Sequence, residues 1–293
     1  MKFNEIIDRA KSSKKKLSVA CADDSKVMRA CINAHKENIA EPIFVGNKSN
    51  MQAIAEKENL DISGFEIVNE ENKKKAVEKA VKLVSDNEAH FLMKGFVDTS
   101  VMLKGVLNKE WGLRTGRLLS HVALFELDKY HKPFMITDGG MNIRPDLKSK
   151  IDILNNAAGF FHRIGIERPK AAVLGAVEKV NPDMPETIDA SYLSKMADRG
   201  QIEGMDIDGP LAFDLAVSSE SARHKGVEST VAGDADILLV PDIASGNMLA
   251  KSLIYMTDCK VAGMIVGAKC PIVLLSRSDS EETKKMSIAV AAM

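Results

Sequence analysis

The sequence predicts an α/β protein in which mostly parallel strands alternate with helices. Two observations lead to this prediction: short apolar runs of strand length recur along the chain, and segments with helical apolar spacing separate them. The composition agrees, since 45% of the 293 residues are hydrophobic and 28% are charged, as in ordinary globular proteins. This length suits one large domain or two domains of ordinary size.

The first half of the chain is expected to hold strands and helices in alternation. Asp24 offers a helix N-cap, and apolar residues recur at helical spacing over 73–84. The expected helices are 3–10, 25–35 and 73–84, and the expected strands are 17–20, 42–46, 65–69 and 90–95.

The order of elements changes near the middle of the chain. Residues 121–127 and 133–137 are strand-like and a short charged turn joins them, so we expect an antiparallel pair. The Asp-Gly-Gly run at 138–140 breaks the pattern, and we place the domain boundary there. Pro210 is expected in the first turn of a helix. The remaining expected elements are helices at 146–164 and 280–292, a helix opened by 245–247, and strands at 170–175, 205–208, 236–240, 261–265 and 272–275.

Composition and missing motifs exclude several classes of function. Lys and Arg number 40 against 41 Asp and Glu, which gives no general field for nucleic acid. The four cysteines have no zinc-ligand spacing, and no GxGxxG, GxxxxGK[ST], GxSxG or HExxH motif occurs. The N-terminus has no signal-peptide core and no apolar run approaches membrane-spanning length, so a cytoplasmic location is expected.

Basic and hydroxyl side chains gather in the segment 112–121. It holds Arg114 and Arg117 without a carboxylate, and Thr99, Ser100 and Lys104 lie shortly before it. Guanidinium groups and hydroxyls near a helix N-terminus are typical of phosphate sites. The alternative is structural, with both arginines solvated or paired to acidic neighbours, because most arginines lie at the surface.

The second half carries further polar segments at expected strand ends, where open α/β sheets bind ligands. Ser276 and Arg277 follow the last expected strand. Gly246 and Asn247 lie where a helix is expected to open, and they are either a helix cap or part of a ligand-binding loop.

Taken together, these segments resemble the phosphate acetyl/butyryltransferase family over nearly the whole chain. The resemblance depends on the residues at 106–110, 112–117, 120–122, 176–178, 181–182, 184–185, 198–202, 208–212, 224–226, 231–233, 246–247 and 276–277.

The resemblance implies two three-layer α/β/α domains of the isocitrate/isopropylmalate-dehydrogenase-like type, with an active-site cleft between them. The first domain would comprise residues 1–137 and 272–293, and the second 138–271. The implied reaction exchanges a short acyl group, butyryl above all, between coenzyme A and inorganic phosphate in a ternary complex. The implied partners are these substrates and further copies of the chain, with no metal or cofactor.

Several residues acquire roles from the resemblance. Ser276 and Arg277 would hold the phosphate or acyl phosphate, together with Thr99, Ser100 and Lys104. Arg114, Arg117, Gly246 and Asn247 are candidates for coenzyme A. Acetyl-transferring relatives carry an aspartate where this chain has Thr283, so Asp279, Glu281 or Glu282 is left as the base, with Asp279 our choice. The structural alternative is that these three acids only favour a helix N-terminus.

Three other functions stay open from the sequence. Acetyl-CoA is the nearest alternative substrate. A decarboxylating dehydrogenase of the same fold would need NAD, a divalent metal and an acidic cluster, and the sequence offers no convincing aspartate triad. A non-catalytic acyl-coenzyme A sensor is the third.

Overall fold

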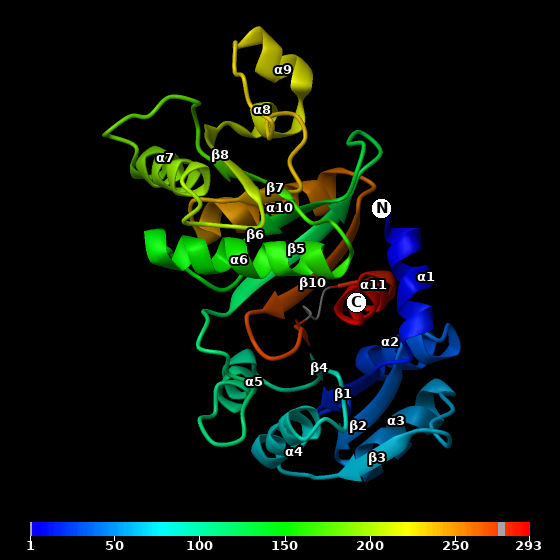
Figure 1. Ribbon diagram of the computed structural model, residues 1–293. Coiled ribbons are helices and arrows are strands. Elements are labelled where there is room, and N and C mark those ends of the chain that lie inside the picture. The colour runs from blue at the N-terminus through cyan, green and yellow to red at the C-terminus, as the bar shows by residue number, and fades with distance from the viewer. Residues whose placement is uncertain (1, 275–278) are drawn as a thin grey trace. The chain divides into compact units, whose positions relative to one another are not determined.

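The computed structural model describes residues 2–274 and 279–293, which form two compact α/β units (Figure 1). Unit 1 comprises Met1–Arg117 and Ala262–Met293, and unit 2 comprises Leu118–Val261. The α/β fold class is as predicted. The strands are β1 (Lys16–Ala20), β2 (Glu41–Gly46), β3 (Glu66–Asn69), β4 (Phe91–Lys94), β5 (Ser120–Glu126), β6 (Phe134–Thr137), β7 (Lys170–Leu174), β8 (Asp206–Leu211), β9 (Ile237–Leu239), β10 (Lys260–Val266) and β11 (Ile272–Val273).

Helices form near the segments where the sequence predicts them, and additional helices lie between the predicted elements. They are α1 (Phe3–Ser13), α2 (Ser25–Lys36), α3 (Lys48–Glu58), α4 (Lys73–Ser85), α5 (Thr99–Val106), α6 (Leu147–Arg163), α7 (Pro185–Asp198), α8 (Phe213–Val217), α9 (Ser219–His224), α10 (Ile243–Met256) and α11 (Glu281–Ala291).

The unit boundaries differ from the expected domain boundaries of 137/138 and 271/272. Residues 118–137 group with unit 2 because β5 pairs with β6, and β6 pairs with β9. Residues 262–271 group with unit 1 because β10 pairs with β11, and β11 with β4. The unit boundaries therefore fall before β5 and within β10, and not at the Gly-Gly run.

In unit 1 the strands have the order β3-β2-β1-β4-β11-β10. The first five are parallel where they pair, and β11 meets β10 in antiparallel fashion. Helices α2 and α3 contact each other beside β2 and β3, whereas α4 contacts β1, β2, β4 and α5. Asp24 caps α2 as predicted, because its carboxylate accepts a hydrogen bond from Val27 N at 3.0 Å.

The C-terminal helix α11 completes unit 1. It contacts α1 and α2, and Figure 1 shows it beside α1 although the two are at opposite ends of the sequence. Nearly all of α11 after its first turn is buried, including Ile288 and Ala289, which are fully inaccessible. Lys15 Nζ also donates to the main-chain oxygen of Met293 at 3.1 Å. The unit thus consists of the two ends of the chain.

In unit 2 the strands have the order β5-β6-β9-β7-β8. β5 and β6 are antiparallel, as predicted, with Val122 opposite Thr137, and the other pairs are parallel. α6 contacts β5, β6, β9 and α7, whereas α10 contacts β6 and α8 contacts β7.

Pro210 corrects one expectation, because it lies within β8 and not in a helix. β8 is at the end of the strand order and pairs with β7. An edge strand has one side without ladder bonds, so a residue lacking an N–H is tolerated there. Among the described residues, no helix is both long and apolar enough to cross a membrane.

Candidate active site

The N-terminal turn of α5 carries the first predicted phosphate ligands. Thr99 and Ser100 open the helix directly after β4, and both side chains are exposed. Asp98 occupies the N-cap position, but its side chain caps no amide. The amides at this terminus are therefore not neutralised by a local carboxylate cap, which is the state that favours an anion.

Lys104 lies on the same face of α5 as Ser100, since the two are four residues apart. Its side chain is exposed, and no ion pair involves it within the described part of the chain. The structure thus places one ammonium and two hydroxyls in the first two turns of a single helix.

The connection from β4 to α5 is fixed against the end of β1. Gly95 N donates to Ala20 O at 2.8 Å and Phe96 N to Cys21 O at 2.7 Å. A Cβ at position 95 would lie 2.1 Å from Cys21 O, so only glycine fits there. Lys94 Nζ donates to Val97 O at 3.0 Å. These contacts determine where α5 begins, and sequence reasoning missed them because they join distant segments.

Ser276 and Arg277 lie outside the described residues. Asp279 is half-buried, and its main-chain oxygen accepts a hydrogen bond from Lys284 Nζ. Burial lowers the pKa of Lys284, while the nearby Asp279 opposes that change. β11, the strand before this segment, pairs in parallel with β4, with Val273 opposite Met93. The chain therefore leaves β4 and β11 at the same edge of the unit 1 sheet.

The alternative carboxylates lie in the first turn of α11. Glu281 is 3.3 Å from Arg29 Nε, and Glu282 is exposed. Thr283 N donates to Ser280 Oγ at 3.0 Å, which makes Ser280 the N-cap. The two glutamates thus occupy the positions at which a helix favours acids, as the structural alternative predicts.

The segment with Arg114 and Arg117 is held by its apolar and hydroxyl side chains. Leu113 is buried, its N–H donates to Val106 O, and its carbonyl accepts from Lys269 N at 2.9 Å. Thr115 Oγ1 donates to Gly267 O. Both arginine side chains are exposed, with no ion pair among the residues that the structure describes. Of the structural alternatives, the geometry thus matches solvated arginines and not paired ones.

Gly246 and Asn247 lie inside α10 and are not its cap. The N-cap is Asp242, whose carboxylate accepts from Ser245 N at 2.8 Å. A Cβ on Gly246 would lie 2.8 Å from the Cα of Gly139, so the two backbones are in contact. Asn247 Nδ2 also approaches Gly139 O at 3.4 Å. These two residues hold the loop that follows β6.

Asp138 organises that loop and was missed as a functional candidate. The side chain is buried and accepts from the amides of Gly140, Met141 and Asn142, and from Asn142 Nδ2 at 2.6 Å. The signal was the Asp-Gly-Gly run after a strand, which we interpreted only as a boundary. Its position at a strand's carboxyl end places this rigid loop where α/β sheets bind ligands.

A cluster of three charged side chains lies in the segments that follow β7 and β8 in unit 2. Lys225 Nζ is 3.6 Å from both Glu178 and Asp214. These distances allow attraction but no direct hydrogen bond. Among the described residues, no group of three or more His, Cys, Asp or Glu is arranged to hold a metal ion.

Comparison with known proteins shows similarity over the whole chain. The family model described as "Phosphate acetyl/butaryl transferase" matches residues 1–81 and 71–292. A phosphate butyryltransferase of Clostridium acetobutylicum is 53% identical over 99% of this chain and 97% of its own. A phosphate acetyltransferase of Thermotoga maritima is 41% identical over 100% of this chain and 99% of its own.

Solved structures agree with this similarity. A branched-chain phosphotransacylase from Enterococcus faecalis superposes with a TM-score of 0.84 at 36% identity, covering 94% of this chain and 97% of its own. A 4-hydroxythreonine-4-phosphate dehydrogenase from Klebsiella pneumoniae shares the fold alone, with a TM-score of 0.59 at 12% identity over 94% of this chain and 98% of its own. The chain therefore belongs to the phosphate acetyl/butaryl transferase family.

Proposed function

We propose that this protein transfers a butyryl group between coenzyme A and inorganic phosphate. The observation that carries the proposal is the 53% identity to a phosphate butyryltransferase over essentially the full length of both chains. The acetyltransferase relative is less similar, at 41% identity. The exposed hydroxyls and ammonium of α5 support a phosphate site in unit 1.

In the direction that forms acyl phosphate, a phosphate oxygen attacks the thioester carbonyl carbon. The new C–O bond forms, the C–S bond breaks, and coenzyme A leaves as a thiolate. Such a thiolate needs little acid assistance, because a free thiol has an ordinary pKa of about 8.5. Holding the two anionic substrates together supplies most of the rate enhancement, without a covalent enzyme intermediate, a metal or a cofactor.

Named side chains take separate roles in this reaction. Lys104, Thr99 and Ser100 bind the phosphate, joined by Ser276 and Arg277. Ser276 donates to the oxyanion of the tetrahedral intermediate. Lys104 is a point charge without the bidentate fork of arginine, so it attracts phosphate but does not orient it. Asp279 takes up the phosphate proton, and Arg114, Arg117 and Asn247 contact coenzyme A. Gly246 is packed against Gly139 and takes no part in this contact.

A thiol-release assay tests the proposal. Butyryl-CoA and acetyl-CoA are compared with and without phosphate, and release is expected only with phosphate. Because each methylene fitted into a pocket changes binding by about 1–3 kcal/mol, kcat/KM for butyryl-CoA should exceed that for acetyl-CoA by at least about tenfold. Absence of phosphate-dependent release would contradict the proposal, and a rate that requires NAD and a divalent metal would favour the dehydrogenase.

The same assay tests the role of Arg277. Arg277→Ala should lower kcat/KM by about a hundredfold or more, because the variant lacks the cation that offsets the negative charge of the phosphate. Lys269→Ala serves as a matched control for a lost cation in unit 1. An Arg277→Ala variant that retains full rate and phosphate affinity would remove this residue from the proposed site.

We also propose that the protein works as a homo-oligomer, with α10 in the contact between copies. Only Gly246 of its 14 residues is buried. Met248, Tyr255 and Met256 are 64%, 71% and 84% exposed, although large apolar side chains seldom gather at a monomer's surface. Light scattering of wild type and Tyr255→Lys tests this, and a wild-type monomer at micromolar concentration would contradict it.

A further inference from the structure

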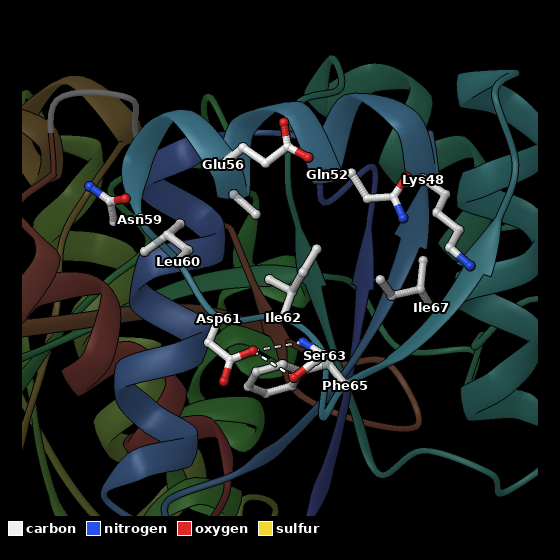
Figure 2. Close-up of a pocket in the computed structure, with 11 residues that line it drawn as sticks. Lys48, Gln52, Glu56, Asn59, Leu60, Asp61, Ile62, Ser63, Phe65 and Ile67 are labelled. Carbon is white, nitrogen blue, oxygen red and sulfur yellow. Dashed lines mark hydrogen bonds between the residues drawn. The ribbon is translucent and has the colours of Figure 1, made fainter.

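A pocket that no proposed catalytic residue lines is in unit 1. It has a volume of about 650 Å³ and lies between α3 and the edge strand β3 (Figure 2). The connection from α3 to β3 closes one side of it. A volume of this size is typical of sites that enclose small molecules.

The floor of this pocket, which we call the α3–β3 pocket, is apolar. It consists of Ala55, Leu60, Ile62, Phe65 and Ile67. All five side chains are at least partly buried. Phe65 is further fixed by ring contacts at 4.9 Å to His35 and 5.3 Å to Phe44. A hydrocarbon chain would gain free energy by leaving water for this floor.

The walls are hydrogen-bonded without any ligand. Asn59 adopts a left-handed conformation with φ of 51°, and its N–H donates to Ala55 O and Glu56 O at the end of α3. Asp61 accepts hydrogen bonds from both the N–H and the hydroxyl of Ser63, at 3.0 and 2.7 Å. A pocket whose walls are already ordered loses less entropy when a ligand binds.

One end of the pocket is polar and cationic. Lys48 and Gln52 lie one turn apart at the start of α3, and Figure 2 shows both at the Ile67 end, away from Leu60. Lys48 N donates to Asn69 Oδ1 at 3.0 Å, which ties this turn to β3. Neither side chain has a partner within the described ranges. The positive end of the helix dipole adds to the charge of Lys48.

Two carboxylates, those of Glu56 and Asp61, also line the pocket. Figure 2 shows Glu56 along α3, extending away from Asp61 and Ile62. Asp61 is at the opposite end from Lys48 and is engaged with Ser63. The pocket therefore has an apolar body, and Lys48 is the one cation among the residues that line it.

We infer that the α3–β3 pocket binds a medium-chain monocarboxylate, with the carboxylate at Lys48 and Gln52 and the hydrocarbon chain on the apolar floor. The volume accommodates a chain longer than butyrate. Each additional buried methylene strengthens binding about fourfold, so an eight-carbon acid fits the site better than a four-carbon one. This inference does not depend on the proposed acyl transfer, because none of the proposed catalytic residues lines the pocket.

Calorimetric titration with octanoate, butyrate, octan-1-ol and octylammonium tests this inference. Octanoate should bind saturably, butyrate at least tenfold more weakly, and the uncharged and cationic probes more weakly than octanoate. Saturating coenzyme A and phosphate should leave octanoate binding unchanged. Absence of saturable binding, equal binding of octan-1-ol, or loss of binding with coenzyme A would overturn the inference.

Two lysine variants on the same helix sharpen the experiment. Lys48→Met should weaken octanoate binding about fivefold, as expected for a partly exposed ion pair, and should leave acyl transfer unchanged. Lys57→Met is the matched control, because Lys57 is an exposed lysine of α3 that does not line the pocket. Equal affinities of wild type and Lys48→Met for octanoate would show that Lys48 does not bind the carboxylate.

Discussion

Gly139 and Gly246 touch through their backbones, with a hypothetical Cβ of Gly246 only 2.8 Å from the Cα of Gly139. The contact joins the loop after β6 to the first turns of α10. Since neither backbone can retreat without disturbing a strand or a helix, the pair determines where the Asp138 loop lies.

Gly246→Ala is therefore expected to destabilise the protein. The added methyl group overpacks the contact, at a cost of roughly 1–3 kcal/mol in the free energy of unfolding. Urea denaturation measures it. Gly159→Ala in α6 is the matched control, because a Cβ there meets nothing within 4 Å. That change should be neutral or stabilising, and equal losses in both variants would contradict the prediction.

Lys104→Ala should raise KM for phosphate about fivefold, because an exposed cation that pairs with a bound anion contributes on the order of 1 kcal/mol. Lys104→Arg should retain the affinity of wild type or improve it, since a guanidinium can form two parallel hydrogen bonds. Initial rates at varied phosphate measure both. Lys109→Ala, an exposed lysine just beyond α5, provides the control and should behave as wild type.

Lys150→Met should destabilise unit 2 strongly. The Lys150 side chain is only 5% exposed and its ammonium lies 2.6 Å from Asp189 on α7. Removing one charge leaves the other half-buried and unpaired, at a cost of roughly 2–4 kcal/mol. The double variant Lys150→Met/Asp189→Leu should recover part of that loss in thermal unfolding.

The exposed pair Lys195–Asp198 is the control for this measurement. Lys195→Met should change the free energy of unfolding by less than about 0.5 kcal/mol. If Lys150→Met lowered the free energy of unfolding by no more than Lys195→Met does, burial would not strengthen the Lys150–Asp189 interaction.

Acid should destabilise the network around Asp234. Partial burial raises the pKa of this carboxyl, but hydrogen bonds from Lys170, Lys132 and His131 together lower the pKa well below the usual range. When the pKa of a carboxyl is lower in the folded protein than in the unfolded chain, ionisation of that carboxyl stabilises the folded protein. The stabilisation is present at pH values above the pKa in the unfolded chain, which is about 3.9 for aspartate. That contribution is lost as the pH falls below this value.

Urea denaturation at several pH values between about 5 and 3 measures the effect. The free energy of unfolding should fall less steeply with acid in Asp234→Asn than in wild type. Asp198→Asn, in an exposed pair, should retain the wild-type slope. Identical slopes in wild type and Asp234→Asn would contradict the prediction.

Elements with their own apolar period and capping residue were predictable from the sequence. α4 is an example, because its buried residues recur at helical spacing and Asn72 caps it. α3 was not predicted, since only Met51 and Ala55 of its residues are buried and the apolar pattern is weak. β8 was predicted too short because Gly209 and Pro210 are usual turn residues, and only the edge position explains them.

The candidate site was predictable as residue types but not as geometry. The closeness of the hydroxyls at 99 and 100 to the cation at 104 was predictable, because these residues are neighbours in the sequence and lie on one helix. The contacts of Gly95 with β1 and of Gly246 with Gly139 join segments far apart in the sequence. No local pattern contains such a contact. The predicted helix cap at 245–247 was wrong for a different reason, because Asp242 caps α10 and the helix begins at Ile243.

The way in which α11 completes unit 1 has a consequence for biosynthesis. Domains generally fold as units while the ribosome extends the chain at roughly 5–20 residues per second. Unit 2 is continuous in sequence and can fold as soon as it emerges from the ribosome. The helices α1 and α2 pack against α11, which is synthesised on the order of ten seconds after them. During that interval the apolar surface that later packs against Ile288 and Ala289 is exposed, and chaperones can bind it. The protein's yield in cells should therefore depend on how fast its last segment is translated.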